Sequence, residues 1–481
     1  MKILLLVPSS RETENVHRDV LYGCWCKGSR IGGGTLPPLS LLSTATVLKQ
    51  AGHDVVLRDM IEENIGFEQL KDVVKYIDVV IVLTSTMSFV EDSNLLLELK
   101  EFNEGLKTIV FGAHPSFMPE NTLEHPGIDM IIRREPEFVV RDLISLMNEG
   151  KDYDSLNGIG YKKNNRVFVN PFYPFVDYNQ IPISDRSLLS QSSHYYNPII
   201  KQYPYTTTTT SQGCPGKCKF CTAPGMTGQK LRYWNAEKVL EEIEYLLCLG
   251  YKEIYYRDET FTTFRKRNIE IARSIIERKY AFSWICNVRV GTVDKGTLAL
   301  MRDAGCRLIK VGVESGVQEI LNLSMKKINI KDSKELFKWA RDLGIDTHAH
   351  LMFGLPGETK ETIEKTIDFI FEIEPTTIDV GICTPYSGSV LYDELLEKYP
   401  DIGDITDVDL RNLHLEANYN EYFTDAPREY IEESINKVYR KFYLRPKYIF
   451  KWITRMRILS DFKYITRAGL NVLKFAAKIS K

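Results

Sequence analysis

Three cysteines lie close together in the sequence CPGKCKFC, with the spacing C-x3-C-x2-C. They are Cys214, Cys218 and Cys221, and they directly follow a β-branched stretch, residues 205–213, of the kind that forms strands. Three clustered thiolates are one too few for a closed structural zinc site. If they hold a four-iron, four-sulfur (4Fe–4S) cluster, one iron keeps no protein ligand and can bind a small molecule. The alternatives are a zinc site completed by a distant Cys or His, or three unrelated thiols.

The residues around this cysteine loop predict a parallel barrel. After residues 205–213, further strand candidates alternate with amphipathic helical stretches such as residues 236–250. These strand candidates are residues 253–258, 282–290, 307–315, 346–354 and 377–385. Six strand–helix units indicate a partial or complete parallel barrel, which carries its chemistry at the carboxyl ends of its strands.

The N-terminal third predicts a separate α/β domain. Five apolar runs have the composition of buried parallel strands and mostly alternate with helical patterns: residues 2–7, 54–59, 77–85, 107–112 and 128–134. This order indicates an open, doubly wound, Rossmann-like sheet, which binds ligands beyond the carboxyl ends of its strands. We therefore expect four parts: this domain over residues 1–150, a linker or cap over 151–200, a (β/α)6 partial barrel over 201–400 and a C-terminal helical segment over 401–481.

The cysteine loop resembles that of the radical S-adenosylmethionine (SAM) enzymes, in which a C-x3-C-x-aromatic-C loop follows the first barrel strand. Phe220 occupies the aromatic place. The resemblance implies that the open iron of a 4Fe–4S cluster binds SAM. Cleavage of SAM then gives a 5′-deoxyadenosyl radical, which abstracts hydrogen from an unactivated carbon. The resemblance also implies an external electron donor of the flavodoxin or ferredoxin type.

Later strand ends resemble the SAM-binding segments of that family, in the same order along the chain. These segments are RDETFT (257–262), GVESG (312–316), GLPGET (354–359) and TPYSGS (384–389). The resemblance assigns the following residues to SAM: Phe220, Asp258, Glu259, Arg289, Glu314, Ser315 and Gly354.

The N-terminal third and the barrel together are similar to the cobalamin-binding branch of the radical SAM enzymes. Residues 35–59 resemble the start of the cobalamin domain, and residues 111–120 resemble its phosphate and nucleotide loop. His17 has no Asp two residues before it and no Gly three residues after it, so the Asp-x-His-x-x-Gly loop of the cobalamin mutases is missing. We therefore expect no histidine ligand on cobalt. The resemblance assigns the following residues to cobalamin: Thr84, Ser85, Gly112, His114 and Glu135.

The resemblance predicts that the protein transfers a methyl group to an unactivated carbon of a small-molecule or lipid substrate. Cobalamin would carry the methyl group, and a second SAM would supply it. An alternative on the same scaffold is ring formation, ring contraction or oxidation without net methylation. A further alternative is a non-catalytic protein that keeps the cluster for structure.

Two histidines and a tyrosine are weaker candidates for catalysis. His348 and His350 point to the same side of their predicted strand, because side chains alternate along a strand. On the barrel interior they would line the active site as proton donors or acceptors. On the outer face they would be buried, hydrogen-bonded residues. Tyr386, near the end of the last predicted strand, is a candidate substrate contact.

Composition places the chain among multidomain globular proteins. Its 481 residues exceed the size of a single hydrophobic core, and its net charge of −2 gives no indication of nucleic-acid binding. The sequence begins without a signal-peptide pattern, and no stretch approaches the roughly 20 apolar residues of a membrane span. Its 9 cysteines do not form the pattern of a disulfide framework. We therefore expect a cytoplasmic protein.

The C-terminal segment, residues 440–481, differs in composition from the rest. Twelve basic side chains accompany one acid, Asp461, and aromatic residues such as Trp452 and Phe475 lie between them. This pattern is typical of a segment that lies on a membrane surface, here the inner face, and it would favour a lipid or isoprenoid-like substrate. The alternative is that the segment packs its apolar face on the barrel and exposes its charges to water.

Overall fold

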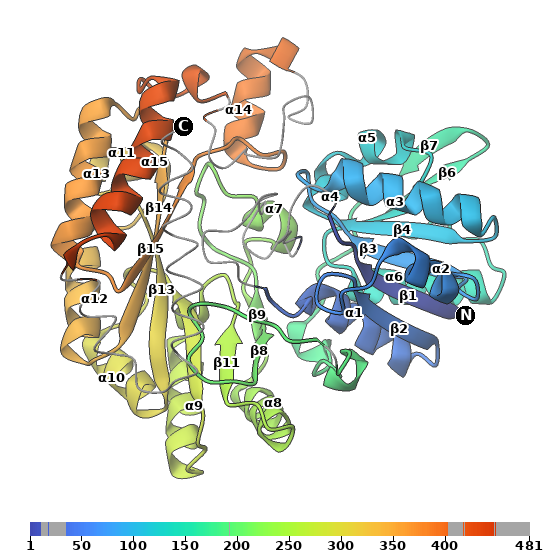
Figure 1. The fold of residues 1–481 in the computed structure, drawn as a ribbon, viewed down its shortest axis with the longest axis horizontal. Coiled ribbons are helices and arrows are strands. Elements are labelled where there is room, and N and C mark those ends of the chain that lie inside the picture. The colour runs from blue at the N-terminus through green and yellow to red at the C-terminus, as the bar shows by residue number, and fades with distance from the viewer. Residues whose placement is uncertain are drawn as a thin grey trace.

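A computed structural model of the chain describes residues 1–10, 18, 35–191, 193–402, 417, 419–446 and 448. It contains two α/β domains that lie side by side, with the short helix α7 (Ala223–Thr227) between them (Figure 1). His17 and residues 449–481 of the basic segment lie outside the described residues.

Seven strands form the sheet of the N-terminal domain, in the order β2-β1-β3-β4-β5-β6-β7. The five predicted strands are parallel: β1 (Lys2–Val7), β2 (Asp54–Asp59), β3 (Val79–Leu83), β4 (Lys107–Gly112) and β5 (Met130–Arg133). The helices are α1 (Leu39–Gln50), α2 (Phe67–Val74), α3 (Phe89–Phe102), α4 (Ala113–Phe117), α5 (Pro119–Glu124) and α6 (Glu137–Asn148). Alternate residues of β1 enter two separate apolar cores, one on each face of the sheet. Because both faces are covered, the strands are continuous apolar runs.

Residues 151–200 are rich in Tyr, Pro, Asn and Ser, a composition that predicts an irregular linker or cap, yet they contain a β-hairpin. Strand β6 (Ile159–Lys163) pairs antiparallel with β5 and with β7 (Arg166–Val169). The two turn residues, Asn164 and Asn165, have φ angles of 51° and 59°. Two-residue hairpin turns require such positive angles, which asparagine tolerates. The prediction of an irregular segment is therefore wrong for residues 159–169, where the turn chemistry outweighs the composition.

Six parallel strands form the second sheet, in the order β15-β14-β13-β12-β11-β8. They are β8 (Tyr205–Thr208), β11 (Glu253–Tyr256), β12 (Ser283–Val288), β13 (Cys306–Glu314), β14 (Asp346–Phe353) and β15 (Thr377–Ile382). Two short strands, β9 (Ser211–Gln212) and β10 (Arg232–Tyr233), pair beside it. The helices are α8 (Ala236–Cys248), α9 (Arg265–Glu277), α10 (Lys295–Asp303), α11 (Gln318–Leu323), α12 (Ile330–Asp342), α13 (Lys360–Ile373), α14 (Val390–Lys398) and α15 (Arg428–Tyr443). This architecture confirms the predicted fold class.

The side chains of β13 and β14 alternate between the two faces of this sheet. Val311 and Ala349 belong to the large core that also contains helix residues such as Phe337 and Ile367. This core lies between the strands and the outer helices (Figure 1). Because successive side chains point to opposite faces, the alternate residues, His348 among them, face the barrel interior.

Helix α15 covers the open edge of this sheet at β15. The hydroxyl of Tyr439 accepts a hydrogen bond from the Val380 N–H (3.0 Å), and the hydroxyl of Tyr443 accepts one from the Ile378 N–H (2.9 Å). These bonds satisfy edge groups that would otherwise pair with solvent or another chain. Phe442, on the same helix, is fully buried. The described start of the basic segment therefore packs on the barrel.

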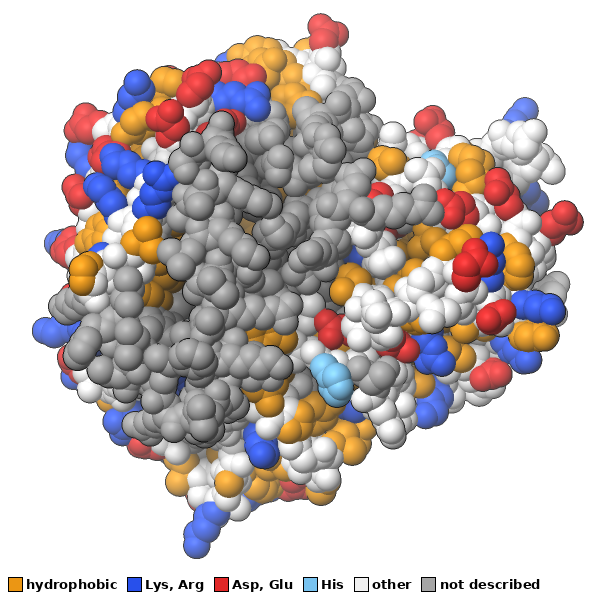
Figure 2. Space-filling model, viewed as in Figure 1, with side chains coloured by type: hydrophobic (Ala, Val, Ile, Leu, Met, Phe, Trp, Pro, Cys, Tyr) orange, Lys and Arg blue, Asp and Glu red, His pale blue; other side chains and the backbone are white. Residues whose placement is uncertain are grey.

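In the part of the chain that the structure describes, no helix combines the length and the apolar character that crossing a bilayer requires. Figure 2 shows acidic and basic side chains interspersed over the described surface of both domains on this face.

Candidate active site

The cysteine loop after β9 places two of its three thiols beside Gly216. A Cβ atom on Gly216 would lie 3.2 Å from the Sγ of Cys214 and 3.8 Å from the Sγ of Cys218. Burial raises the pKa of Cys221 to about 12, and the neighbouring Cys218 and Cys214 add to this rise. Buried thiols this close together become thiolates when a bound metal balances their charge. The donor set therefore fits an iron–sulfur cluster.

Segments outside the loop hold its backbone in place. The Cys214 N–H donates to the Gly228 carbonyl (3.0 Å), and the Lys219 N–H donates to the Ser324 carbonyl (3.0 Å). The Lys219 carbonyl in turn accepts from the Leu391 N–H (2.8 Å). Three parts of the barrel thus fix where the thiols lie.

A carboxylate and two cations lie beside the loop. Glu314 ends β13 with a φ of 64°, which is uncommon for a residue other than glycine. Its Oε1 accepts from the Lys326 Nζ at 2.6 Å, and both side chains are about nine-tenths buried. Arg289 donates to the Lys326 carbonyl and lies 3.3 Å from the Cβ position of Gly216. Such a set complements an amino-acid group, which carries one carboxylate and one ammonium.

Two neighbouring acids after β11 have different surroundings. Asp258 is fully buried and accepts from the hydroxyl of Thr210 (2.8 Å) and from the hydroxyl of Ser211, so it ties the end of β8 to the end of β11. Glu259 accepts from the Thr227 hydroxyl (2.7 Å) through Oε1, whereas no described residue donates to its buried Oε2. Burial raises the pKa of Glu259 to about 7. An unsatisfied buried carboxylate oxygen is a fit for a polar group of SAM.

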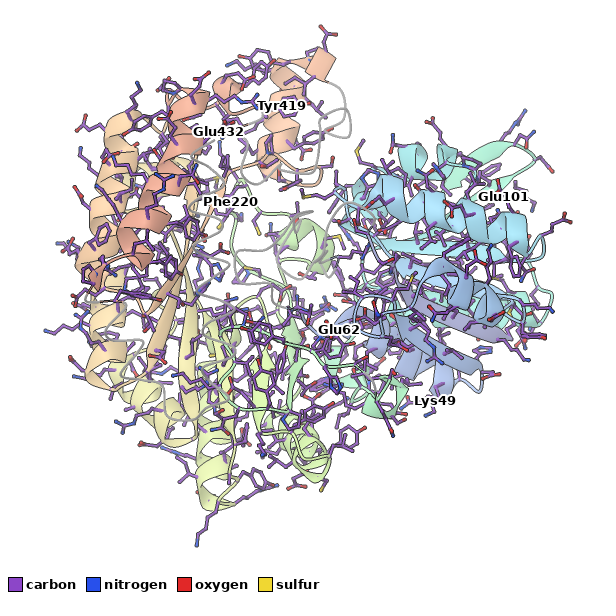
Figure 3. The ribbon with its side chains drawn as sticks, in the orientation of Figure 1. Lys49, Glu62, Glu101, Phe220, Tyr419 and Glu432 are labelled. Carbon is purple, nitrogen blue, oxygen red and sulfur yellow. The ribbon has the colours of Figure 1, made fainter. Side chains whose placement is uncertain are left out.

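The remaining predicted SAM contacts lie at the same ends of the strands. Ser315 is buried and its hydroxyl accepts from the Val317 N–H (3.1 Å), at the start of α11. Gly354 has a φ of 74°, and its carbonyl accepts from the Asn420 side chain at 2.8 Å. Phe220 lies near the strand ends (Figure 3) and packs against an apolar cluster that includes Leu355. Their contacts with SAM stay predictions.

The carboxyl ends of the two sheets meet at the domain interface. Tyr386, which follows β15, donates from its hydroxyl to the sulfur of Met87, which follows β3, at 3.6 Å. Phe117 of α4 inserts against two barrel glycines. A Cβ atom on Gly225 would lie 2.9 Å from the Phe117 ring, and one on Gly388 would overlap the ring. The predicted substrate contact Tyr386 thus lies between the two domains.

A buried ion pair also crosses this interface. Glu135, after β5, accepts from both terminal nitrogens of Arg232 in β10, one of them at 2.8 Å. Their side chains are 15% and 8% exposed. The guanidinium of Arg232 also lies 4.6 Å from the ring centroid of Phe175. Glu135 therefore binds the barrel domain, and its contact with cobalamin stays a prediction.

The other residues assigned to cobalamin lie on the edge of the N-terminal sheet that faces the barrel. Thr84 donates to Asp92 (2.8 Å), and Ser85 bonds to Ser88 through their hydroxyls (3.1 Å). Gly112 has a φ of 128°, and a Cβ there would overlap the Thr84 carbonyl, so only glycine fits. Across the interface, the buried Ser387 hydroxyl has no partner among the described residues. This unsatisfied group fits a polar ligand held between the domains.

His114 lies on the same edge but its ring is enclosed. The ring stacks on Phe89 with centroids 4.3 Å apart, and its nitrogens lie 3.4 Å from the Thr86 hydroxyl and 3.2 Å from the Asn121 side-chain oxygen. The side chain is 1% exposed. Its ring nitrogens are thus already occupied by protein partners.

His348 and His350 face the barrel interior, together with a residue that the sequence did not indicate. Their ring centroids lie 4.6 Å apart, and His350 Nδ1 lies 3.7 Å from Asp379 Oδ2 on β15. Burial lowers the pKa of both histidines, so the imidazoles are neutral at neutral pH. Of the two positions considered from the sequence, the interior one is correct.

Comparison with known proteins identifies the family. The Radical SAM superfamily matches residues 208–370, and the B12 binding domain matches residues 32–144. A protein of Pyrococcus horikoshii named uncharacterized methyltransferase PH0819 is 31% identical over 464 residues, which cover 94% of each chain. The chain belongs to the cobalamin-dependent radical SAM enzymes. The predicted family and its three cofactors, a 4Fe–4S cluster, SAM and cobalamin, are thereby confirmed.

Other members of the family differ in their reactions. An anaerobic magnesium-protoporphyrin IX monomethyl ester cyclase of Rubrivivax gelatinosus is 28% identical and covers 76% of this chain and 67% of its own length. The fold matches that of the radical SAM methyltransferase TsrM from Kitasatospora setae with a TM-score of 0.71, over 100% of both chains at 16% identity. This likeness shows that the two-domain arrangement is the fold of the family.

Several residues of the site carry no local signal in the sequence. Lys326 follows α11 in a stretch, SMKKIN, that is typical of a surface loop, yet it is 8% exposed. Arg232 and Phe117 come from different domains and meet their partners only when the domains dock. A buried lysine beside a buried acid is visible only in the tertiary structure.

Proposed function

We propose that the enzyme transfers a methyl group to an unactivated carbon of a small-molecule substrate held between its two domains. The observation that carries this proposal is the meeting of the two sheet edges, where Tyr386 contacts Met87. One edge carries the residues assigned to cobalamin and the other carries the cysteine loop, so both cofactors would reach one substrate. The name of the Pyrococcus horikoshii relative, a methyltransferase, supports the same reaction.

In this proposal the protein's residues bind and orient the cofactors. When bound, the cluster with SAM supplies a carbon radical, and cobalamin supplies a methyl group. Cys214, Cys218 and Cys221 would hold the cluster. Glu259 and the pair of Glu314 with Lys326 would orient the amino-acid end of SAM, because they offer opposite charges beside the cysteine loop.

The N-terminal domain would hold cobalamin without a histidine ligand to cobalt. His114, which lies within the predicted phosphate loop, has both ring nitrogens beside protein partners. His17 lies outside the described residues. Replacement of His17 by Ala should leave the absorption spectrum of the bound cobalamin unchanged, and a spectrum that shows loss of an imidazole ligand would contradict this part of the proposal.

The test of methyl transfer uses SAM labelled on its methyl group. Anaerobically reconstituted protein, a chemical reductant and a metabolite extract would be incubated together. A product that carries the label, accompanied by S-adenosylhomocysteine, supports the proposal. The alternative is ring formation, ring contraction or oxidation, which the cyclase name of one relative illustrates. A product without label, formed together with 5′-deoxyadenosine, would favour that alternative.

A lipid or isoprenoid-like substrate is a separate hypothesis, which depends on membrane contact by residues 440–481. The described aromatic residues of this segment favour packing on the barrel, since Phe442 is buried and Tyr443 hydrogen-bonds to β15. Co-sedimentation with anionic vesicles at low salt separates the two arrangements. Binding that disappears when residues 449–481 are removed supports the membrane hypothesis, and no binding by the full chain rules it out.

A further inference from the structure

We propose that His348, His350 and Asp379 bind a divalent metal ion inside the barrel, at a site separate from the iron–sulfur cluster. One ligand atom of each residue lies within 4.8 Å of the corresponding atoms of the other two. Two imidazoles and one carboxylate form a recurring ligand set for Fe²⁺, Zn²⁺ and Mn²⁺. The cluster is held by sulfur, whereas this site offers nitrogen and oxygen.

The distance between two of these residues fits shared ligation better than a direct bond. His350 Nδ1 and Asp379 Oδ2 are 3.7 Å apart, which is too long for a hydrogen bond. Two ligands with metal bonds of about 2.0–2.2 Å lie about 2.8–3.6 Å from each other. The observed separation is close to that range, so small side-chain rotations complete the site.

Strand register brings the three residues together. In the parallel pairing of β14 with β15, His350 lies opposite Asp379 and His348 lies opposite Thr377. The two histidines are two residues apart and therefore share the inward face. The position of the three side chains thus follows from the edge strand β15 and its neighbour β14, and not from a loop.

Hydrogen bonds from neighbouring residues orient two of the ligands. His348 Nδ1 lies 2.7 Å from the Thr377 hydroxyl, and Asp379 Oδ1 accepts from the Tyr439 hydroxyl at 3.0 Å. These bonds engage one ring nitrogen of His348 and one oxygen of Asp379, and the proposed ion would bind the other atom of each side chain. Bonds of this kind hold metal ligands in place in known sites.

The side chains are accessible enough for an ion to enter. His348 is 9% exposed, and the side chains of His350 and Asp379 are 27% and 47% exposed. Three protein ligands leave coordination positions open for water or a substrate oxygen. Gly312 connects this site to the predicted SAM residues. It pairs with His350 in the sheet, and its Cβ position is 2.6 Å from Glu314 Oε1. The open coordination positions would therefore lie next to the SAM residues, on the side nearer the start of the strands.

The nearby Lys310 carries a positive charge, which by itself would favour the binding of an anion over that of a metal ion. It lies opposite His348 in the register, but its ammonium donates to the Tyr255 hydroxyl at 2.8 Å. The lysine charge is thus directed to a neighbour on β11, while the carboxylate of Asp379 is directed to the two histidines. This arrangement favours a cation between the three ligands.

The test titrates Mn²⁺ into the full-length protein with its cluster reconstituted, and follows the free ion by electron paramagnetic resonance. We expect one bound ion per chain, with nitrogen couplings from the histidines in pulsed spectra. Replacement of Asp379 by Asn should weaken binding by more than tenfold, and Thr377→Val, which keeps all three ligands, by about tenfold. The matched control is His125→Ala in the N-terminal domain, which should bind as the wild type does.

Two results would overturn the proposal: no bound Mn²⁺ in the wild-type protein, or equal affinity for Mn²⁺ in the wild type and both barrel variants. Circular dichroism establishes that each variant is folded. Because binding is measured directly, the result does not depend on whether the enzyme methylates its substrate.

Discussion

The hydroxyl of Tyr386 lies 3.6 Å from the sulfur of Met87, and this contact joins the end of the last barrel strand to the end of a central strand of the N-terminal sheet. Ligands of both kinds of sheet bind beyond the carboxyl ends of the strands. The contact therefore places the sheet edge with the residues assigned to cobalamin against the sheet edge that carries the cysteine loop. It explains how one substrate could meet both cofactors.

Replacement of Cys218 by Ala should abolish SAM cleavage, because two thiolates retain a 4Fe–4S cluster poorly. Iron and sulfide content and the formation of 5′-deoxyadenosine measure the two effects. Cys286→Ala is the matched control, since Cys286 is fully buried in the large apolar core away from the loop, and it should keep both the cluster and the cleavage. Cleavage retained by the Cys214, Cys218 and Cys221 triple Ala variant would contradict the assignment.

Replacement of Arg232 by Ala should destabilise the protein by about 3–5 kcal/mol, because it leaves the carboxylate of Glu135 buried without its partner. Urea denaturation measures this change. The control is Arg278→Ala: Arg278 and Glu244 form an ion pair whose side chains are 47% and 50% exposed, and solvent screens such pairs so that they add little stability. Equal losses in the free energy of unfolding would show that the buried interdomain ion pair stabilises the protein no more than the exposed pair does.

Replacement of Gly388 by Ala should lower the free energy of unfolding more than replacement of Gly344 by Ala does. Both glycines have a positive φ, 87° and 72°. Alanine in the left-handed region costs about 1–2 kcal/mol at either position. At Gly344 a Cβ meets nothing within 4 Å, whereas at Gly388 it overlaps the ring of Phe117. The overlap should add about 1–3 kcal/mol in denaturation experiments. This added cost should shrink in the Phe117→Ala background, and an added cost of the same size there would contradict the contact.

The free energy of unfolding should fall as the pH rises toward 8, and Glu358 should be one cause. Burial raises the pKa of Glu358 to about 8 from its usual 4.5, although the Gly354 and Leu355 N–H groups lower it. Between these values the folded state holds a proton that the unfolded chain releases, so each pH unit removes up to about 1.4 kcal/mol. Glu358→Gln should flatten this slope, as measured by denaturation at several pH values. The exposed Glu361→Gln control should keep it.

The cysteine loop, the parallel strands along the chain and the family could be predicted from the sequence because each depends on local pattern. Cys214 to Cys221 form one short motif, and continuous apolar runs mark strands that are buried on both faces. The hairpin over residues 159–169 also had a local signal, its Asn-Asn turn, which composition alone concealed.

Only the tertiary structure decided which distant residues meet at the site. Asp379 faces His350 because two parallel strands pair in one register, and a slip of one residue would turn either side chain to the other face. Lys326 reaches Glu314, and Tyr386 reaches Met87, because the helices and domains pack in one way. Such contacts depend on burial and docking summed over many residues. The sequence by itself therefore determined which chemistry the chain carries, and packing determined which side chains surround it.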